Sequence, residues 1–440
     1  MYEDEISINI PHKDIDAIDH LNNDHMIAFN TIMAVVEGRE SALFFIDGPR
    51  GTGKTYLYRT LLEKLRRMSH IVLATTSSGI AANLLSSGRT AHSRFKIPLN
   101  VDASSMCSIS KQSALARLIQ DSTAIIWDEV PMTHRHVFKA LDRTFRDIMD
   151  VELPFGGKIM IFCGDFRQVL PVIPKGTRSE LIQASIVKAT FWVQTKILRL
   201  RQNRRSINDH QFAEFLLRVG DGSEQVINEE IRRLPECMVV PWESDQSINQ
   251  IIDEVFPNLG DHVDDARYMV DRALITLIND DVDVLNEKII NMFSGEEITL
   301  YSFDSVEDDM RNLYQPEFLY SITAGGLPPH KLTFKVGASI MLLRNIDPKL
   351  GLCNGTRLLC RGSYQNLIDP EILTGQFAGT RVFLPRIPLK SAENAGLPFQ
   401  LTRKQFPVKL SFSLTINKSQ GMVETEALGD VFPYFHVVEA

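Results

Sequence analysis

The chain has 440 residues, and the usual domain size of about 100–200 residues predicts two or three domains. Hydrophobic residues make up 44% and charged residues 23%, which is the composition of an ordinary folded protein. Apolar runs such as 42–46 are five or six residues long, whereas a membrane span needs about 20, and the acidic start at 1–5 differs from a secretory signal or a transit peptide. We therefore expect an intracellular protein with no membrane partner.

The first half of the chain alternates short apolar runs with helical patterns. The runs at 43–47, 71–75, 123–127 and 158–163 predict strands, and the apolar spacing over 56–68 predicts a helix. Strands that alternate with helices are typical of a parallel sheet covered on both faces, so the fold class is α/β. Further along, we expect a helix over 211–219 and a β-rich portion from 334 onward.

Residues 48–55 read Gly-Pro-Arg-Gly-Thr-Gly-Lys-Thr and follow the first predicted strand. This pattern between a strand and a helix is typical of a phosphate-binding loop (P-loop), in which backbone N–H groups and a helix N-terminus surround phosphate oxygens. We expect Gly48, Gly51 and Gly53 to shape the loop, Lys54 to reach the β- and γ-phosphates of ATP, and Thr55 to bind Mg²⁺.

A P-loop needs a carboxylate that helps to hold Mg²⁺ and a base for the attacking water. The apolar run at 124–127 ends in Asp128 and Glu129. We assign Asp128 as a metal ligand and Glu129 as the general base. An ordinary strand end is the alternative reading of an isolated Asp-Glu pair.

Residues 164–172 (Gly-Asp-Phe-Arg-Gln-Val-Leu-Pro-Val) follow another apolar run, and residues 415–421 read Thr-Ile-Asn-Lys-Ser-Gln-Gly. Together with the P-loop and Asp-Glu, this order of motifs resembles the PIF type of superfamily-one DNA helicase, in the variant found in Helitron transposons. The resemblance covers about 21–421. It implies a P-loop NTPase with two RecA-like lobes, 1–200 and 201–440, the second with a small β-barrel insertion at about 335–405.

The resemblance also implies an activity: translocation along single-stranded DNA from 5′ to 3′, with ATP hydrolysis driving duplex unwinding. Gln168 matches the family's γ-phosphate sensor, and Arg205 matches its arginine finger. The matching positions for strand contacts are Thr76, Ser77, Thr90, His92, Asn417 and Lys418. We expect a monomer that acts at DNA duplex junctions in repair, recombination or telomere maintenance, in the nucleus or, alternatively, in mitochondria.

Three other sets of residues bear on possible binding sites. Seven bases and one acid occur between 377 and 421, and we expect this basic stretch to face DNA phosphates, with a solvated basic surface as the alternative. Five scattered cysteines, without a Cys-x-x-Cys pair, disfavour disulfides and zinc. His134 and His136 lack a third metal-binding neighbour, so we read them as surface groups.

The sequence departs from the family pattern at two places. His25 stands where the family has a glutamine that reads adenine, so the resemblance implies that His25 binds the nucleotide. Imidazole cannot offer an amide's simultaneous donor and acceptor to one base, so selectivity for adenine is not expected. The family's Val-Ala-Leu-Ser-Arg segment does not follow Gly421, and the last arginine is Arg403. A loss of turnover is then expected, which leaves a catalytically inactive, transposon-derived protein that binds ATP and single-stranded DNA as the alternative function.

Overall fold

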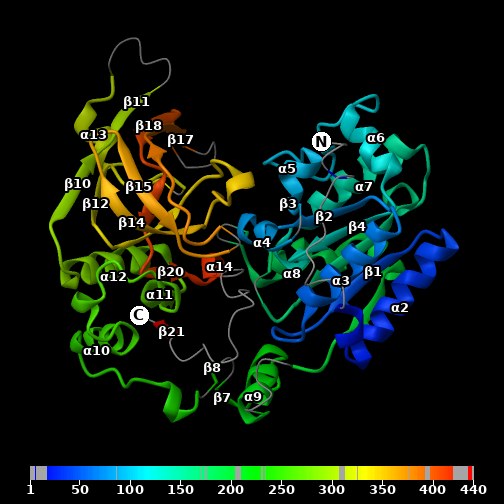
Figure 1. The fold of residues 1–440 in the computed structure, drawn as a ribbon, viewed down its shortest axis with the longest axis horizontal. Helices are drawn as coiled ribbons and strands as arrows, with labels where there is room; N and C mark the ends of the chain where they lie inside the picture. The colour runs from blue at the N-terminus through cyan, green and yellow to red at the C-terminus, as the bar shows by residue number, and fades with distance from the viewer. Residues whose placement is uncertain are drawn as a thin grey trace. The chain divides into compact units, whose positions relative to one another are not determined.

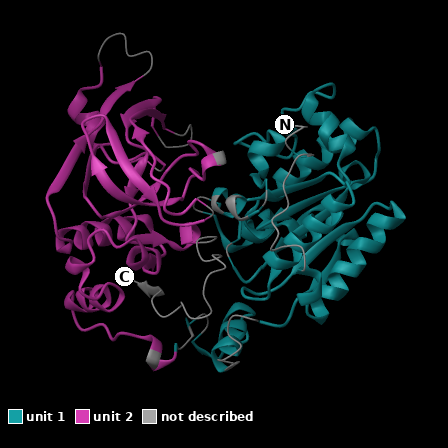
Figure 2. Cartoon of the chain, viewed as in Figure 1, with its two compact units in different colours: residues 1–234 teal, residues 235–440 magenta. Residues whose placement is uncertain are grey.

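The computed structural model describes most of the chain in two compact units, 1–234 and 235–440 (Figure 2). The described residues are 5, 17–85, 87–168, 170–173, 176–203, 210–228, 231–232, 234–306, 313–324, 326–375, 377–391, 397–419 and 435–438. The expected boundary at 200/201 falls inside the first unit, because Leu200 is buried in its core, Arg201 donates its N–H to Asp24, and Asn203 contacts the P-loop. Within the described residues, no helix has the length and apolar content needed to cross a bilayer.

The first unit is built on a six-stranded parallel sheet in the order β3-β2-β4-β5-β1-β6 (Figure 1). Its strands are β1 (Leu43–Asp47), β2 (Val72–Thr76), β3 (Arg89–Thr90), β4 (Ala124–Asp128), β5 (Ile159–Gly164) and β6 (Lys196–Arg199). The four strands predicted from sequence are confirmed to within one residue. A separate hairpin is formed by β7 (Val226–Asn228) and β8 (Ile231–Arg232).

Helices cover both faces of this sheet, so its strands are buried on both sides. Ile125 and Trp127 of β4 pack into one core, and Ala124 and Ile126 pack into the other, as the period of two in a strand requires. The first core includes residues of α5, α6 and α7, and the second includes residues of α2 and α3. The helices of this unit are α2 (Asn23–Gly38), α3 (Lys54–Arg67), α4 (Gly79–Leu84), α5 (Ala91–Phe95), α6 (Ala114–Asp121), α7 (Arg135–Met149), α8 (Arg178–Ala184) and α9 (His210–Gly220).

The predicted helices of the first unit are confirmed with small shifts, and one histidine acquires a structural role. Helix α3 begins at Lys54, two residues before the expected start, and α9 covers the expected 211–219. His134 is the N-cap of α7, where its Nδ1 accepts a hydrogen bond from the N–H of His136 at 3.1 Å. Capping explains this histidine without a metal.

The second unit combines a small parallel sheet with three antiparallel sheets. Strand β9 (Ala273–Thr276) lies between β20 (Ser413–Thr415) and β21 (Phe435–Val438), all parallel. The antiparallel sheets have the orders β10-β12, β11-β18-β17 and β16-β15-β14-β13-β19. The helices are α10 (Gln246–Val255), α11 (Ala266–Val270), α12 (Asn279–Met292), α13 (Pro316–Ser321) and α14 (Ile416–Ser419).

The β-rich portion of this unit begins earlier than the expected 334. It starts with β10 (Glu297–Tyr301) and β11 (Phe303–Val306), which pair with strands distant along the chain: Ile298 opposes Phe334, and Asp304 opposes Arg403. Such pairing has no local signal in the sequence. The remaining strands are β12 (Lys331–Lys335), β13 (Ser339–Leu342), β14 (Arg357–Ser363), β15 (Leu367–Ile372), β16 (Leu384–Pro385), β17 (Ile387–Lys390), β18 (Leu401–Gln405) and β19 (Val408–Leu410).

A buried ion pair joins β11 and β18. The Arg403 guanidinium lies 2.6 Å from Asp304 Oδ2, and the side chains are 2% and 0% exposed. The guanidinium also donates to the carbonyl oxygens of Leu319, Ile322 and Pro328, which fastens the segment around α13 to β18. Arg403 is thus an internal structural residue.

Removing the acid of this pair should destabilise the second unit. Asp304→Ala leaves the Arg403 charge buried without its counter-ion, and we expect a loss of about 3–5 kcal/mol in the free energy of unfolding. Urea unfolding followed by circular dichroism measures the change. The control is Lys404→Ala, which truncates the exposed neighbour on β18 and should cost no more than about 0.5 kcal/mol. Equal costs for the two variants would refute a stabilising role for the pair.

Candidate nucleotide site and nucleic-acid contacts

The P-loop connects β1 to α3 through two residues with left-handed backbone. Gly51 has φ +87° and Gly53 has φ +78°, a region that residues with a Cβ atom rarely adopt. A methyl group at Gly51 would lie 2.4 Å from Asn203 Oδ1, and one at Gly53 would lie 2.9 Å from His25 Cε1. Only glycine therefore fits at both positions, which allows the backbone to turn as a phosphate cradle requires.

Two side chains from outside the P-loop hold its backbone. His25 Nε2 lies 2.7 Å from the carbonyl oxygen of Thr52, and because a carbonyl only accepts, Nε2 carries the proton. Asn203 Nδ2 donates to the carbonyl oxygen of Arg50 at 3.2 Å. His25 is fully buried on α2 and supports the loop directly. Its contact with a nucleotide base stays a prediction.

Lys54 begins α3 and points back over the loop. Its Nζ donates to the carbonyl oxygens of Gly48 at 2.7 Å and of Pro49 at 3.4 Å. The Thr52 hydroxyl also donates to the Pro49 carbonyl, at 2.8 Å. The ammonium group is therefore held within the loop to which the sequence assigns phosphates, and it is largely buried there.

The two predicted Mg²⁺ ligands are connected through a third side chain. Tyr58 donates a short hydrogen bond to Asp128 Oδ2, and its hydroxyl lies 3.0 Å from Thr55 Oγ1. Thr55 and Tyr58 lie three residues apart on α3, and Asp128 ends β4. The structure thus brings Thr55 and Asp128 together as predicted, and adds Tyr58, which sequence reasoning missed.

Glu129, the predicted general base, has an unusual backbone conformation. Its φ is +54° and its ψ is +39°, in the left-handed region that non-glycine residues rarely occupy, and it precedes a short 3₁₀ helix, η3 (Val130–Met132). Strain of this kind costs about 1–3 kcal/mol and is common at functional sites. Glu129 is half-buried, so part of the residue is exposed to solvent.

Gln168, the predicted γ-phosphate sensor, follows β5, which is hydrogen-bonded to β1. Its Nε2 donates to Asp165 Oδ2 at 3.1 Å. Arg167 lies 3.1 Å from Asp165, 3.6 Å from Asp47 and 2.7 Å from Asp221. Burial raises the pKa of Asp47, while the Arg167 guanidinium opposes that rise. Arg167 thereby joins the ends of β1 and β5, a role that the sequence did not reveal.

These residues fit ATP with Mg²⁺. The loop offers backbone geometry for phosphates, and Thr55 and Asp128 offer hard oxygen donors, the type that Mg²⁺ prefers. Mg²⁺ is commonly held by only one or two carboxylates together with substrate phosphates, so a single aspartate and a hydroxyl suffice. Arg205, the predicted finger, lies outside the described residues.

The predicted DNA contacts in the first unit have structural partners. Thr76 is fully buried and its hydroxyl accepts a hydrogen bond from the N–H of Ser78, so Thr76 is not placed to contact a strand directly, contrary to expectation. Ser77 Oγ accepts from Trp127 Nε1 at 3.1 Å. Thr90 is the N-cap of α5, and burial lowers the pKa of His92, which keeps its ring neutral at neutral pH. Strand contacts by Ser77, Thr90 and His92 stay predictions.

In the second unit, Asn417 is exposed on α14, and Lys418 Nζ donates to Asn354 Oδ1 at 2.7 Å. Burial lowers the pKa of Lys418, and the positive charges of Lys409 and Arg344 lower it further. Lys418, Lys409 and Arg344 therefore form a local group of cations, the α14 basic cluster.

The expectation that the whole basic stretch faces DNA is wrong for part of its residues. Arg403 is buried against Asp304, Arg381 pairs with Asp369, and Arg386 donates to the carbonyl oxygens of Tyr301 and Gln365. These guanidinium groups satisfy partners within the unit. Fewer positive charges are therefore available to a nucleic acid than the seven bases between 377 and 421 suggested.

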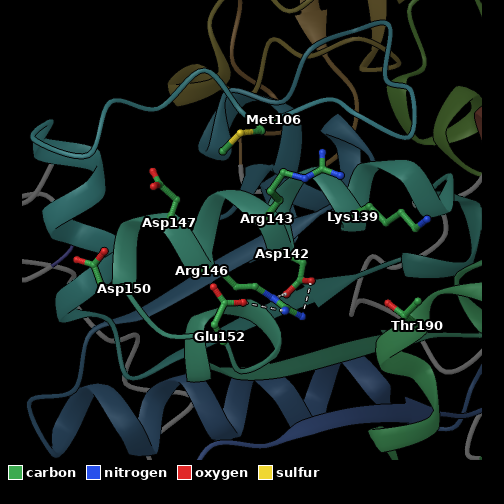
Figure 3. A pocket seen from close by; sticks show the side chains of 9 residues that line it. All are labelled: Met106, Lys139, Asp142, Arg143, Arg146, Asp147, Asp150, Glu152 and Thr190. Carbon is green, nitrogen blue, oxygen red and sulfur yellow. Dashed lines mark hydrogen bonds and ion pairs between the residues drawn. The ribbon is translucent and has the colours of Figure 1, made fainter.

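A polar pocket of about 770 Å³ lies along α7 in the first unit (Figure 3). Its arginines are engaged within the protein: Arg146 pairs with Asp142 and Glu152, and Arg143 donates to the backbone carbonyls of 103–105. Acidic and basic side chains are mixed around it, so we assign it no ligand. The lining residues are Met106, Lys139, Asp142, Arg143, Arg146, Asp147, Asp150, Glu152 and Thr190.

Comparison with known proteins supports the family resemblance that the order of the motifs suggested. A model of the PIF1-like helicase family matches residues 20–230, which contain every part of the nucleotide site described above. The chain is related to the PIF1-like helicases. A second model, of the Pif1 helicase 2B domain, matches 317–362, which in this relative of PIF1 runs from α13 into β14. The Helitron subgroup stays a prediction.

Relatives named "ATP-dependent DNA helicase PIF1" align with nearly the whole chain. The one from Danio rerio is 28% identical over 398 residues (88% of this chain, 54% of the relative), and the one from Xenopus laevis is 26% identical over 408 residues (91% and 56%). The chain thus spans about half the length of these relatives. The crystal structure of Bacteroides Pif1 in complex with ADP-AlF3 and ssDNA superposes with a TM-score of 0.62 at 20% identity (90% of this chain, 83% of the other), which confirms the α/β P-loop fold.

Replacing Gly51 should weaken nucleotide binding. We expect Gly51→Ala to lower the affinity for a fluorescent ADP analogue at least tenfold, because left-handed backbone costs a non-glycine residue about 1–3 kcal/mol and the methyl group would displace Asn203. Fluorescence titration gives the affinity. Gly375→Ala is the matched control, since Gly375 has the same φ of +87° and nothing within 4 Å of an added methyl group. Unchanged affinity in Gly51→Ala would contradict the cradle.

Proposed function

We propose that the chain is an ATP-dependent DNA helicase that translocates 5′ to 3′ on single-stranded DNA and uses ATP hydrolysis to unwind duplexes. The observation that carries the proposal is the convergence of the P-loop, Thr55 and Asp128 at the carboxyl edge of one parallel sheet, where α/β folds bind ligands. Relatives that align with nearly the whole chain are named ATP-dependent DNA helicases, and Bacteroides Pif1 was crystallised with ADP-AlF3 and ssDNA. These names support the proposal.

In the proposed reaction, the loop amides and Lys54 bind the β- and γ-phosphates, and Gln168 contacts the γ-phosphate. Thr55 and Asp128 hold Mg²⁺, which when bound neutralises charge on the phosphate oxygens. Glu129 accepts a proton from the attacking water, and Arg205 stabilises the charge of the transition state. We further propose that the protein acts as a monomer at duplex junctions, in DNA repair, recombination or telomere maintenance, in the nucleus or mitochondria.

The α14 basic cluster supports DNA as the partner. The pKa of Lys418 is lowered first by burial and then by the positive charges of Lys409 and Arg344, and an anionic backbone would offset that repulsion. Phosphate contacts of this kind give affinity without reading base identity. Lys418 is tied to Asn354, which fixes the direction of its side chain.

The direct test is ATP hydrolysis by the full chain with and without single-stranded DNA, followed by unwinding of duplexes with a 5′ or a 3′ tail. We expect stimulation by DNA and unwinding only from the 5′ tail, with both lost in Lys54→Ala. Hydrolysis that DNA does not stimulate, or that survives in Lys54→Ala, would overturn the motor. Binding of ATP and DNA without hydrolysis would support the inactive binding protein instead.

Removing the general base should separate binding from hydrolysis. In Glu129→Gln we expect the ATP hydrolysis rate to fall at least a hundredfold, because general-base catalysis contributes about 10²–10⁴. The ATP affinity should stay within about twofold of the unmodified chain, since the loop and Thr55 are untouched. A rapid-quench hydrolysis assay and a fluorescent-nucleotide titration measure the two quantities. An equal loss of both would assign Glu129 to the binding site.

Removing one cation of the α14 basic cluster should reduce the salt dependence of DNA binding. For Lys418→Ala we expect weaker binding to labelled single-stranded DNA and a slope of log K against log salt that is smaller by about 0.7, the value for one phosphate contact on a single strand. Fluorescence anisotropy across a salt series provides the slope. Lys188→Ala, which truncates an exposed lysine of the first unit, is the control and should leave the slope unchanged. An unchanged slope in Lys418→Ala would remove Lys418 from the DNA contacts.

A further inference from the structure

The Tyr58 side chain lies beside the proposed Mg²⁺ site. It is fully buried, and its hydroxyl contacts both side chains to which the metal is assigned, Asp128 and Thr55. A buried phenol requires a hydrogen-bond partner, but one would be enough. The hydroxyl has two, which come from different elements of the sheet and its covering helix.

The directions of these hydrogen bonds follow from the number of protons. The Tyr58 hydroxyl has one proton, and it goes to the Asp128 carboxylate, because a charge-assisted bond is the stronger choice. The same hydroxyl also donates toward Thr55 Oγ1, 3.0 Å away, as the longer arm of a shared hydrogen bond. The Tyr58 hydroxyl thus joins the side-chain oxygens of Thr55 and Asp128.

This geometry matters because Mg²⁺ demands near-ideal octahedral coordination at short distances. The Thr55 hydroxyl is positioned by rotation about one side-chain bond and the Asp128 carboxylate by rotation about two, so two free side chains would present their oxygens in many relative orientations. A rigid phenol that binds both reduces that freedom before the metal arrives. Groups that orient metal ligands typically contribute 10- to 100-fold to metal affinity.

We propose that Tyr58 is a positioning residue that fixes Thr55 and Asp128 for Mg²⁺ and thereby sets the metal dependence of nucleotide binding. The inference rests on the proposed function, since it takes Mg²⁺-nucleotide as the ligand of the P-loop. Tyr58 itself does not contact the metal, and its effect is transmitted through the two ligands. It therefore affects nucleotide binding only when Mg²⁺ is present.

The test uses Tyr58→Phe, which keeps the ring and removes only the hydroxyl. The affinity of the full chain for a fluorescent ADP analogue is measured in EDTA and then across a MgCl₂ series. We expect the MgCl₂ concentration for half-maximal tightening to rise at least tenfold in Tyr58→Phe, while the affinity in EDTA stays within twofold. The unchanged affinity in EDTA also shows that the variant is folded.

The matched control is Tyr56→Phe, two residues away on the same helix. The Tyr56 hydroxyl donates to the carbonyl oxygen of Ala17 at 2.9 Å, away from the metal ligands, so its loss should leave the Mg²⁺ dependence unchanged. A second comparison places Tyr58→Phe in a Thr55→Ala, Asp128→Ala background. There the hydroxyl has no ligand left to position, and its removal should have no further effect on the Mg²⁺ dependence.

The outcomes separate this inference from the proposed function. Equal Mg²⁺ dependence in Tyr58→Phe and the unmodified chain overturns the positioning role alone. A matching loss of affinity in EDTA and in MgCl₂ overturns it too, because it would show a general structural effect. Failure of the unmodified chain to bind the nucleotide under any condition overturns the proposed function and this inference with it.

Discussion

The left-handed backbone at Gly51 and Gly53 is the constraint on which the nucleotide site depends. With φ near +80° at both residues, the chain leaves β1, turns, and enters α3 within six residues. The absence of side chains at these positions lets His25 and Asn203 approach the loop closely enough to bind its carbonyl oxygens. A Cβ atom at either glycine would remove both the turn and its supports. The same turn places Lys54 and Thr55 at the start of α3, where the helix N-terminus favours anions.

The parallel sheet positions the site residues that lie outside the P-loop. Because β1, β4 and β5 run in the same direction, their carboxyl ends share an edge, where Thr55 and Asp128 are joined through Tyr58 and where Gln168 follows β5. Both faces of the sheet are buried, so each strand is fixed by two cores. Arg167 links the ends of β1 and β5 through Asp47 and Asp165. Precise placement of the site is therefore a consequence of burying the whole sheet.

Sequence reasoning predicted the features that depend on local pattern. The four central strands, the start of α3 and the position of Asp128 follow from apolar runs and from residue types at fixed spacing. It missed Tyr58, whose role requires α3 to lie against the end of β4. It likewise missed the support that His25 gives to a loop 27 residues away. A sequence without structure shows which side chains are polar, but not which of them face each other.

The distribution of charged residues along the sequence also does not show which of them face each other. The excess of bases between 377 and 421 suggested a surface for DNA, yet Arg403 pairs with Asp304, 99 residues distant, and Arg381 pairs with Asp369. A count of charges cannot separate a guanidinium that neutralises an internal carboxylate from one that meets a phosphate. Burial identifies Arg403 as internal, since it is 1% exposed, whereas Arg381 is 58% exposed and only its ion pair shows that it is engaged.

One connection within the first unit joins the two activities that the proposal combines. Ser77, from a segment predicted to contact DNA, donates its backbone N–H to the carbonyl oxygen of Asp128 at 3.1 Å, and its hydroxyl accepts from Trp127. Trp127 and Asp128 directly precede the strained Glu129. The end of β4 thus supports two features: Glu129, the base that would activate water, and the loop at Ser77, which would contact the DNA strand. A displacement of Ser77 by a bound strand would act on the backbone that sets the orientation of Glu129, and this is a physical reason for hydrolysis to respond to DNA.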